Sequence, residues 1–166
     1  MLRLAKLTDY AIVIATYFAE FERSETALTT RALADMSGLP LPTVSKILKA
    51  LSKAGLLSSL RGSSGGYRLA RPAASVTVAD VIAAIEGPIA LTECSSGDTA
   101  GACEIEVRCP SRANWRRINQ TVADALGTLR ISDMPRPRVR PQGELVHIGG
   151  LQVIEPGRRP LAHEEV

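Results

Sequence analysis

The clearest alternation of hydrophobic and polar positions lies between residues 41 and 53. Apolar side chains recur there at the i, i+3, i+4 and i+7 spacing of one helix face, namely Val44, Ile47, Leu48 and Leu51. Pro40 and Pro42 suit a first helical turn, where backbone N–H groups have no helical partner, and Gly55 suits a helix stop. The pattern predicts an amphipathic helix whose other face is polar and cationic.

The flanking residues predict that this helix belongs to a helix-turn-helix with a wing. Residues 30–36 form a shorter predicted helix, and Ser37-Gly38 supplies a sharp turn between the two helices. Residues 56–60 and 67–70 predict two short strands around a glycine-rich tip. A helix, a tight turn, a polar-faced helix and a glycine-tipped hairpin together indicate a winged helix-turn-helix.

The polar face of the second helix has the side chains that a recognition helix needs. Thr43, Ser45 and Lys46 lie near the helix start, where such side chains can meet base edges in the major groove. Cations that can contact DNA phosphates follow on the helix and the hairpin, namely Lys49, Lys53, Arg61, Arg68 and Arg71. The sequence therefore predicts a double-stranded DNA operator as partner. A winged helix that contacts only protein is the alternative.

Two further helices are predicted on either side of this unit. Residues 7–21 carry a broad apolar stripe, with Thr8 as the expected N-cap and Asp9 in the first turn, where a negative charge favours the helix dipole. After the hairpin, Thr77-Val78-Ala79-Asp80 has the form of a capping box with Asp in place of Glu. It predicts a connecting helix that ends at Gly87-Pro88.

All three cysteines lie in a segment of little periodicity, residues 92–110. Cys94, Cys103 and Cys109 are separated by eight and five residues. Structural zinc sites usually show closely spaced cysteine pairs and four ligands, and neither feature is present. The spacing favours an iron–sulfur cluster whose shell is completed by a residue other than cysteine. Metal-free redox thiols, a zinc site and structural cysteines remain alternatives.

Residues 111–131 predict a long helix with a narrow apolar seam. The seam residues repeat in a 3–4 pattern over about two heptads, namely Trp115, Ile118, Val122, Ala125 and Leu129. A seam of this length usually pairs with a copy of itself, which predicts a homodimer, and packing within the chain is the alternative. Five of the ten prolines lie in Pro135–Pro160, so residues 132–166 are expected to form a disordered or loosely attached Pro/Arg-rich tail.

Charge divides the chain into unlike parts. Residues 1–71 contain ten Lys and Arg against five Asp and Glu, residues 72–109 one against six, and residues 110–166 nine against six. A basic N-terminal half suits nucleic acid.

The apolar run at 11–19 is far shorter than the roughly 20 residues of a membrane span, and no signal-peptide pattern accompanies it. We therefore expect a cytoplasmic protein without a membrane partner.

These patterns together predict a mainly α fold with a small β-hairpin. Residues 1–76 are the expected winged helix-turn-helix DNA-binding domain, 77–91 a connecting helix, 92–110 a cysteine loop that binds a cluster, and 111–131 a dimerisation helix. The operator of such a dimer is expected to be an imperfect palindrome. No nucleophile–base pair, phosphate loop or carboxylate pair stands out, so we expect neither an enzyme nor a small-molecule substrate.

Four blocks, Leu4–Ala11, Gly38–Leu51, Arg61–Leu69 and the three-cysteine loop, carry a family resemblance. Over residues 1 to about 134 the chain resembles the Rrf-type (IscR/NsrR) family of iron–sulfur winged-helix regulators, most closely its branch of SUF-system iron–sulfur assembly regulators. The resemblance implies a homodimeric transcription factor that regulates iron–sulfur assembly genes, which we interpret as a repressor. It also implies a 2Fe-2S or 4Fe-4S cluster held by Cys94, Cys103 and Cys109.

The chain departs from this family pattern at two points. The gap of eight residues between the first two cysteines is longer than the usual family spacing. IscR-like members have a histidine ligand three residues after the last cysteine, where this chain has Arg112, which cannot serve. NsrR-like members instead use an aspartate at the start of the first helix of the partner subunit. The resemblance thus implies Asp9 as the remaining ligand. The alternatives are that Asp9 serves only the helix dipole, or that another donor such as Glu93, Glu104 or a solvent molecule completes the shell.

Overall fold

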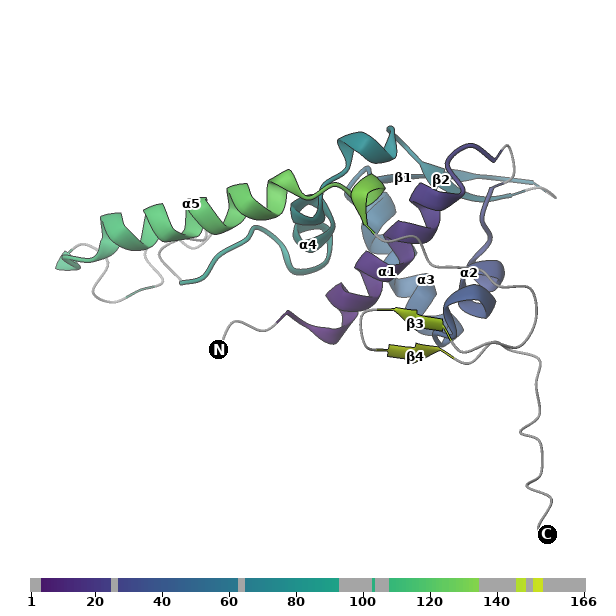
Figure 1. Cartoon of the computed structure of the whole chain (residues 1–166), viewed down its shortest axis with the longest axis horizontal. Helices are drawn as coiled ribbons and strands as arrows, with labels where there is room; N and C mark the ends of the chain where they lie inside the picture. The colour runs from purple at the N-terminus through teal and green to yellow at the C-terminus, as the bar shows by residue number, and fades with distance from the viewer. Residues whose placement is uncertain are drawn as a thin grey trace, which may run out of the picture.

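The computed structural model describes residues 4–24, 27–62, 65–92, 103, 108–134, 146–148 and 151–153 (Figure 1). The α-helices are α1 (Lys6–Glu20), α2 (Thr30–Ser37), α3 (Leu41–Lys53), α4 (Val78–Glu86) and α5 (Arg112–Thr128). Two short 3₁₀ helices, η1 (Ala73–Ser75) and η5 (Ile131–Asp133), precede α4 and follow α5. The strands are β1 (Leu57–Leu60), β2 (Gly66–Leu69), β3 (Val146–Ile148) and β4 (Leu151–Val153).

The turn between α2 and α3 confirms the predicted helix-turn-helix. Gly38 adopts the left-handed conformation, with φ of 68°, that glycine tolerates best. The buried Ser37 hydroxyl donates to the carbonyl of Leu33 at 2.6 Å and accepts from the N–H of Leu39 at 3.3 Å. Pro40 then caps α3. The turn therefore satisfies its own polar groups and fixes the angle between the helices.

The wing is the antiparallel pair β1–β2, in which Leu57 pairs with Leu69 and Leu60 with Gly66. Leu28 adds an isolated bridge to Tyr67, which ties the wing to the connection between α1 and α2. A Cβ at Gly66 would lie 2.8 Å from the carbonyl oxygen of Leu28, so a larger residue there would force the strands apart.

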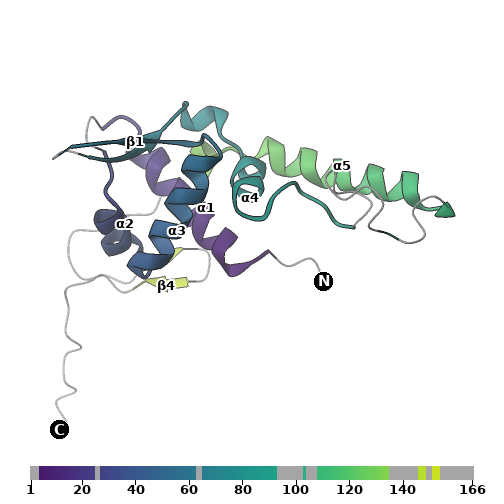
Figure 2. The same ribbon diagram turned by 180° about the vertical axis from the view of Figure 1, so that it is seen from behind.

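The hydrophobic core forms around α1. Helix α1 contacts α2, α3, α4 and η5, and Figure 2 shows α3 crossing in front of it. The largest fully buried side chains come from each of these elements and include Ile14, Leu33, Ile47, Leu48, Leu51, Val81 and Ile131. The apolar face predicted for α3 is therefore its buried face.

The start of α1 differs from the sequence prediction. Helix α1 begins at Lys6 with Ala5 as its N-cap, and Thr8 is a fully buried residue inside the helix. The Glu86 carboxylate accepts from the N–H of Ala5 at 2.9 Å and also from the Thr8 hydroxyl. The prediction that Thr8 is the N-cap is wrong, because the helix begins two residues earlier, at Lys6, and a carboxylate at the end of α4 binds the N–H of the N-cap residue Ala5.

The start of α4 follows the sequence prediction. The Thr77 hydroxyl accepts from the N–H of Asp80 at 3.1 Å, and the Asp80 carboxylate accepts from the N–H of Thr77 at 2.8 Å. This reciprocal pair is the capping box, with Asp in place of Glu. Val76 and Val81 are both buried in the core cluster on either side of it.

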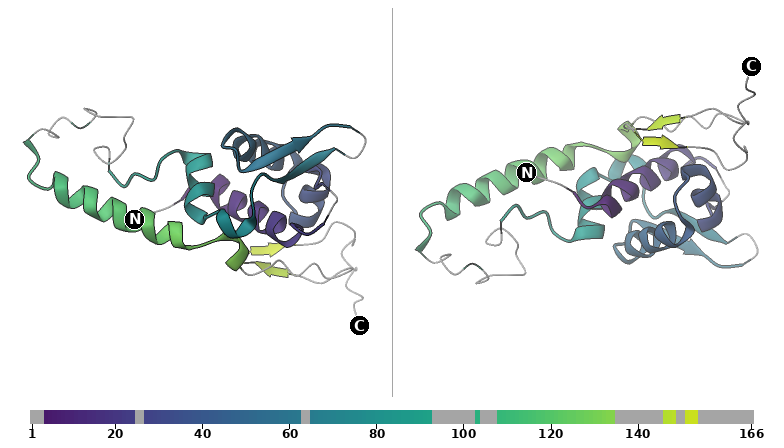
Figure 3. Two further views of the ribbon diagram at one scale, coloured as in Figure 1. Left: turned by 90° about the horizontal axis from the view of Figure 1, so that it is seen from above. Right: turned by 90° about the horizontal axis from the view of Figure 1, so that it is seen from below.

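Helix α5 extends away from the core, as Figures 1 and 3 show. None of its residues is buried within the chain, and its described contacts include α4. Beyond its end the chain returns to the core, where the N–H of Val78 donates to the carbonyl of Leu129 at 2.8 Å and the N–H of Ile131 donates to that of Val76 at 3.0 Å. The C-terminal end of α5 is therefore anchored, while in the described part of the chain none of its residues is fully buried.

The tail contains a feature that the sequence patterns did not predict. Strands β3 and β4 pair antiparallel, with Val146 opposite Val153.

Among the described helices, none is both long enough and apolar enough to cross a lipid bilayer.

Candidate nucleic-acid interface and cysteine site

The outer face of α3 carries the predicted base-reading residues. Thr43 and Ser45 are partly exposed and Lys46 and Lys49 are exposed, whereas the intervening apolar residues are buried. Helix α3 therefore presents short hydroxyl side chains first and cations behind them, as major-groove recognition requires.

Leu41 is a candidate contact that the sequence analysis missed. Its spacing to Val44 and Leu48 suggests an inward position, yet its side chain is 44% exposed at the first turn of α3. Exposed apolar side chains near the start of a recognition helix can contact the thymine methyl group. The two prolines around Leu41 were the available signal, because they place it in the first turn, ahead of the regular helical packing.

The three arginines of the wing differ in whether they form an ion pair. Arg61 and Arg68 are exposed, and neither takes part in an ion pair among the described residues. Arg71 instead donates to the Asp80 carboxylate at 2.7 Å. Arg71 therefore differs from Arg61 and Arg68 in that its charge is already paired with the capping box of α4, so we expect it to contribute less to phosphate contact.

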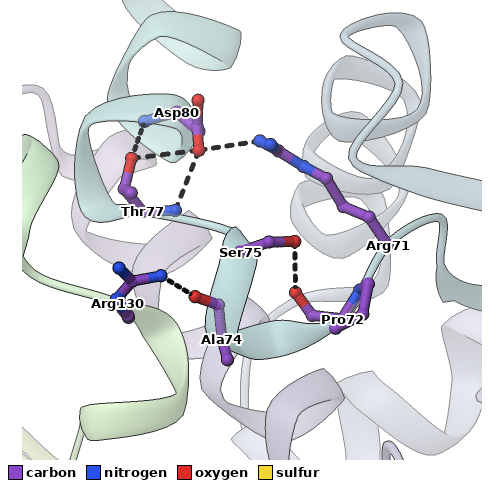
Figure 4. A network of polar contacts seen from close by, with 7 residues as sticks. All are labelled: Arg71, Pro72, Ala74, Ser75, Thr77, Asp80 and Arg130. Atoms are coloured by element: carbon purple, nitrogen blue, oxygen red, sulfur yellow. Dashed lines mark hydrogen bonds and ion pairs between the residues drawn. The ribbon is translucent and has the colours of Figure 1, made fainter.

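Arg71 belongs to a polar network that joins three parts of the fold (Figure 4). Asp80 accepts hydrogen bonds from Arg71 and from both the backbone and the hydroxyl of Thr77. On the other side, the Arg130 guanidinium donates to the carbonyl of Ala74. Arg71 thereby links the end of the wing to the start of α4, and Arg130 links the segment after α5 to η1.

Two of the three cysteines lie in the described part of the predicted loop. Cys94 lies outside the described residues, whereas Cys103 and Cys109 are free and partly exposed. The carbonyl of Cys109 accepts from the N–H of Arg112 at 3.3 Å, which places this cysteine at the start of α5. Within the ranges that the structure describes, no three His, Cys, Asp or Glu side chains come together as a metal site.

The structure places Asp9 in the first turn of α1, with an exposed side chain. It does not bring Asp9 together with Cys103 or Cys109 in one group. The chemistry of the donors still suits an iron–sulfur cluster, because free, partly exposed thiols are soft ligands and an exposed carboxylate is available for another copy of the chain.

Comparison with known proteins gives a consistent result. A family model described as "Rrf2: Iron-dependent Transcriptional regulator" matches residues 4–137. The transcriptional regulator IscR of Vibrio campbellii is 33% identical over 105 residues, which cover 61% of each chain. IscR of Xenorhabdus nematophila is also 33% identical, over 61% of this chain and 62% of the other.

Solved structures of similar fold point to the same class of protein. CymR, the global cysteine regulator of B. subtilis, superposes with a TM-score of 0.61 and 27% identity over 80% of this chain and 95% of its own. IscR of T. potens superposes with a TM-score of 0.59 and 23% identity, covering 80% and 85%, and supports the fold alone. The relatives are transcriptional regulators, and the chain is not an enzyme.

The pairing of Arg71 yields a prediction about DNA affinity. Replacing Arg68 with Ala should lower the slope of log affinity against log salt concentration by about 0.9, the value for one lost phosphate contact. Arg71→Ala should leave that slope unchanged and cost less than about 1 kcal/mol of stability, because its partly exposed ion pair is weak. Fluorescence anisotropy on a mixed-sequence duplex at several salt concentrations measures both slopes. Equal losses of slope would contradict the assignment.

Proposed function

This chain belongs to the Rrf2 family of transcriptional regulators, and we propose that it is a homodimeric repressor whose operator binding is controlled by an iron–sulfur cluster. Its targets, by family likeness, include iron–sulfur cluster assembly genes. The observation that carries the proposal is a helix of a helix-turn-helix with an exposed polar face, in the same chain as the free thiols of Cys103 and of Cys109, which lies at the start of α5. Such a regulator acts on DNA in the cytoplasm.

DNA recognition is assigned to the face of α3 and to the wing. Thr43, Ser45 and Lys46 would read base edges, while Lys49, Arg61 and Arg68 would contact phosphates. The charge distribution supports this division, because residues 1–71 carry twice as many Lys and Arg as Asp and Glu.

Homodimer formation is assigned to the apolar seam of α5. Trp115, Ile118 and Leu129 are 40%, 45% and 50% exposed, although their spacing is that of a coiled-coil seam. Large apolar side chains left uncovered on a projecting helix favour a second copy of the helix as partner. Two recognition helices about 34 Å apart would then read the half-sites of an imperfect palindrome.

Ligation is assigned to Cys94, Cys103 and Cys109, with Asp9 of the other protomer completing the set. When bound, an iron–sulfur cluster supplies an iron site that can change redox state or exchange a weakly held ligand. A carboxylate is a weak ligand beside three thiolates. Because Asp9 lies on α1, which packs on α3, this contact would join the DNA-binding half of one protomer to the cysteine loop of the other.

A second candidate rests on the thiols themselves. Cys103 and Cys109 are free and partly exposed, which also suits a metal-free regulator whose cysteines respond to oxidation. Visible absorption of anaerobically purified protein, with iron and sulfide counts, separates the two candidates. The cluster proposal expects cluster absorption with stoichiometric iron and sulfide, and a colourless protein without iron would favour the thiol regulator.

The seam predicts the effect of charged substitutions on assembly. Ile118→Asp combined with Val122→Asp should give monomers that bind DNA poorly, because it places charges in the apolar interface. Ala113→Asp combined with Arg117→Asp puts two carboxylates at the same i, i+4 spacing on the far side of α5 and should stay dimeric. Analytical ultracentrifugation compares the two pairs, and a dimeric seam variant would refute the interface.

The role of Asp9 predicts a spectroscopic change. Asp9→Ala should alter the visible spectrum and speed cluster loss under anaerobic conditions, with the helical fold retained. Asp124→Ala removes an equal charge from the exposed face of α5 and should behave as wild type. If Asp9→Ala leaves spectrum and cluster lifetime unchanged, Asp9 serves only the helix dipole, worth about 0.3–1 kcal/mol.

A further inference from the structure

A single amide side chain holds the segment that leads into the cysteine loop. Asn119, near the middle of α5, donates from Nδ2 to the carbonyl of Ile89 and accepts at Oδ1 from the N–H of Leu91, each at 3.0 Å. These two main-chain groups lie two residues apart, in the segment that follows α4. A carboxamide suits them because it carries a donor and an acceptor side by side.

The cysteine loop ends where α5 begins. The carbonyl of Cys109 accepts from the N–H of Arg112, at the first turn of α5. Arg112 and Asn119 are seven residues apart, or roughly 10 Å along a helix. Cys94 follows Leu91 by three residues in the sequence and lies outside the described residues. Helix α5 thus bonds to Leu91 just before this stretch and follows directly from Cys109 at its end.

The segment held by Asn119 is tied at its other end to α1. Glu86, three residues before Ile89, accepts from the N–H of Ala5 and from the Thr8 hydroxyl, next to Asp9 in the chain. The stretch from Glu86 to Leu91 therefore spans from the start of α1 to the middle of α5. A shift of α5 relative to the DNA-binding half must either move this stretch or break one of its anchors.

We propose that Asn119 is a positioning residue that fixes the start of the cysteine loop on the dimerisation helix. Through it, the conformation of the loop and the placement of α5 are coupled. The proposal rests on the proposed function in taking the cysteine loop as the sensor. The simpler account is that Asn119 only adds two surface hydrogen bonds and has no effect beyond Ile89 and Leu91.

Two variants and one control separate these accounts. Asn119→Leu removes both hydrogen bonds with little change of size, and Asn119→Asp keeps the acceptor for Leu91 but loses the donor to Ile89. Gln120→Leu is the control, because the neighbouring Gln120 bonds to Asp124 on the exposed face of the same helix. Circular dichroism and sedimentation first establish that each variant is folded and dimeric. If Asn119→Leu does not fold, Asn119→Ala carries the comparison, because it also removes both hydrogen bonds.

Two measurements are made on the metal-free, reduced dimer, so they do not depend on the cluster. Hydrogen–deuterium exchange at Leu91 should become roughly five- to tenfold faster in Asn119→Leu, as expected for a lost hydrogen bond. The rate at which iodoacetamide alkylates Cys94, followed by mass spectrometry, should rise several-fold in Asn119→Leu. It should rise less in Asn119→Asp and stay unchanged in Gln120→Leu.

A third measurement links the residue to the proposed sensor. Iron release to a chelator under anaerobic conditions should be several-fold faster in Asn119→Leu than in wild type or Gln120→Leu. Unchanged exchange at Leu91 would overturn the proposal, and so would faster exchange with wild-type alkylation of Cys94. A wild-type protein without iron would overturn the cluster assignment instead, and exchange and alkylation would still decide the role of Asn119.

Discussion

Helix α1 packs against α2, α3, α4 and η5. Burial of the apolar residues of α1 holds each of these elements in position. Ile14 is fully buried, and Tyr17 and Phe18 are nearly so. Removing apolar surface from water is the dominant favourable term in folding, so this contact sets the orientation of α3 and hence of the polar face offered to DNA. Helix α1 also contacts α4 and η5, the segment after α5, so the DNA-binding half and this segment share one core.

The polar contacts around this core explain how distant parts could influence one another. Arg71 and Asp80 tie the end of the wing to α4, Glu86 ties α4 to the start of α1, and Asn119 ties the following segment to α5. Each contact joins residues from different elements near the segment 71–91. A change at the cysteine loop or at the dimer interface would therefore reach the DNA-binding half through short, directional contacts as well as through packing.

Local patterns were sufficient to predict most of the fold. The helical spacing of Val44, Ile47 and Leu48 predicted α3 and its buried face, and the capping box predicted the start of α4. These features depend on neighbours within one turn of helix, which the sequence displays directly. The exposed seam of α5 agrees with its narrow apolar stripe, and the face of α3 is exposed where base-reading residues were expected.

The errors and omissions arose where the partner lies far along the chain. Thr8 was predicted to be the N-cap, but its hydroxyl donates to Glu86, which is 78 residues away. Nothing in the local sequence indicates that contact. The sequence shows Arg71 as another wing cation and does not show its ion pair with Asp80. Asn119 resembles any polar residue on a helix surface until Ile89 and Leu91 are placed against it. The ligand set remains a prediction, because Cys94 lies outside the described residues and Asp9 would act across two chains.

The central claim is that cluster state controls operator binding, and the most direct test compares one dimer preparation before and after anaerobic removal of the cluster. Affinity is measured for a duplex selected from random sequences by the loaded dimer, with a mixed-sequence duplex as reference. The account predicts that affinity for the selected duplex changes by about five- to 150-fold, the range of typical coupling between two sites, while the reference changes little. Equal affinity of the loaded and cluster-free dimers for the selected duplex would contradict it.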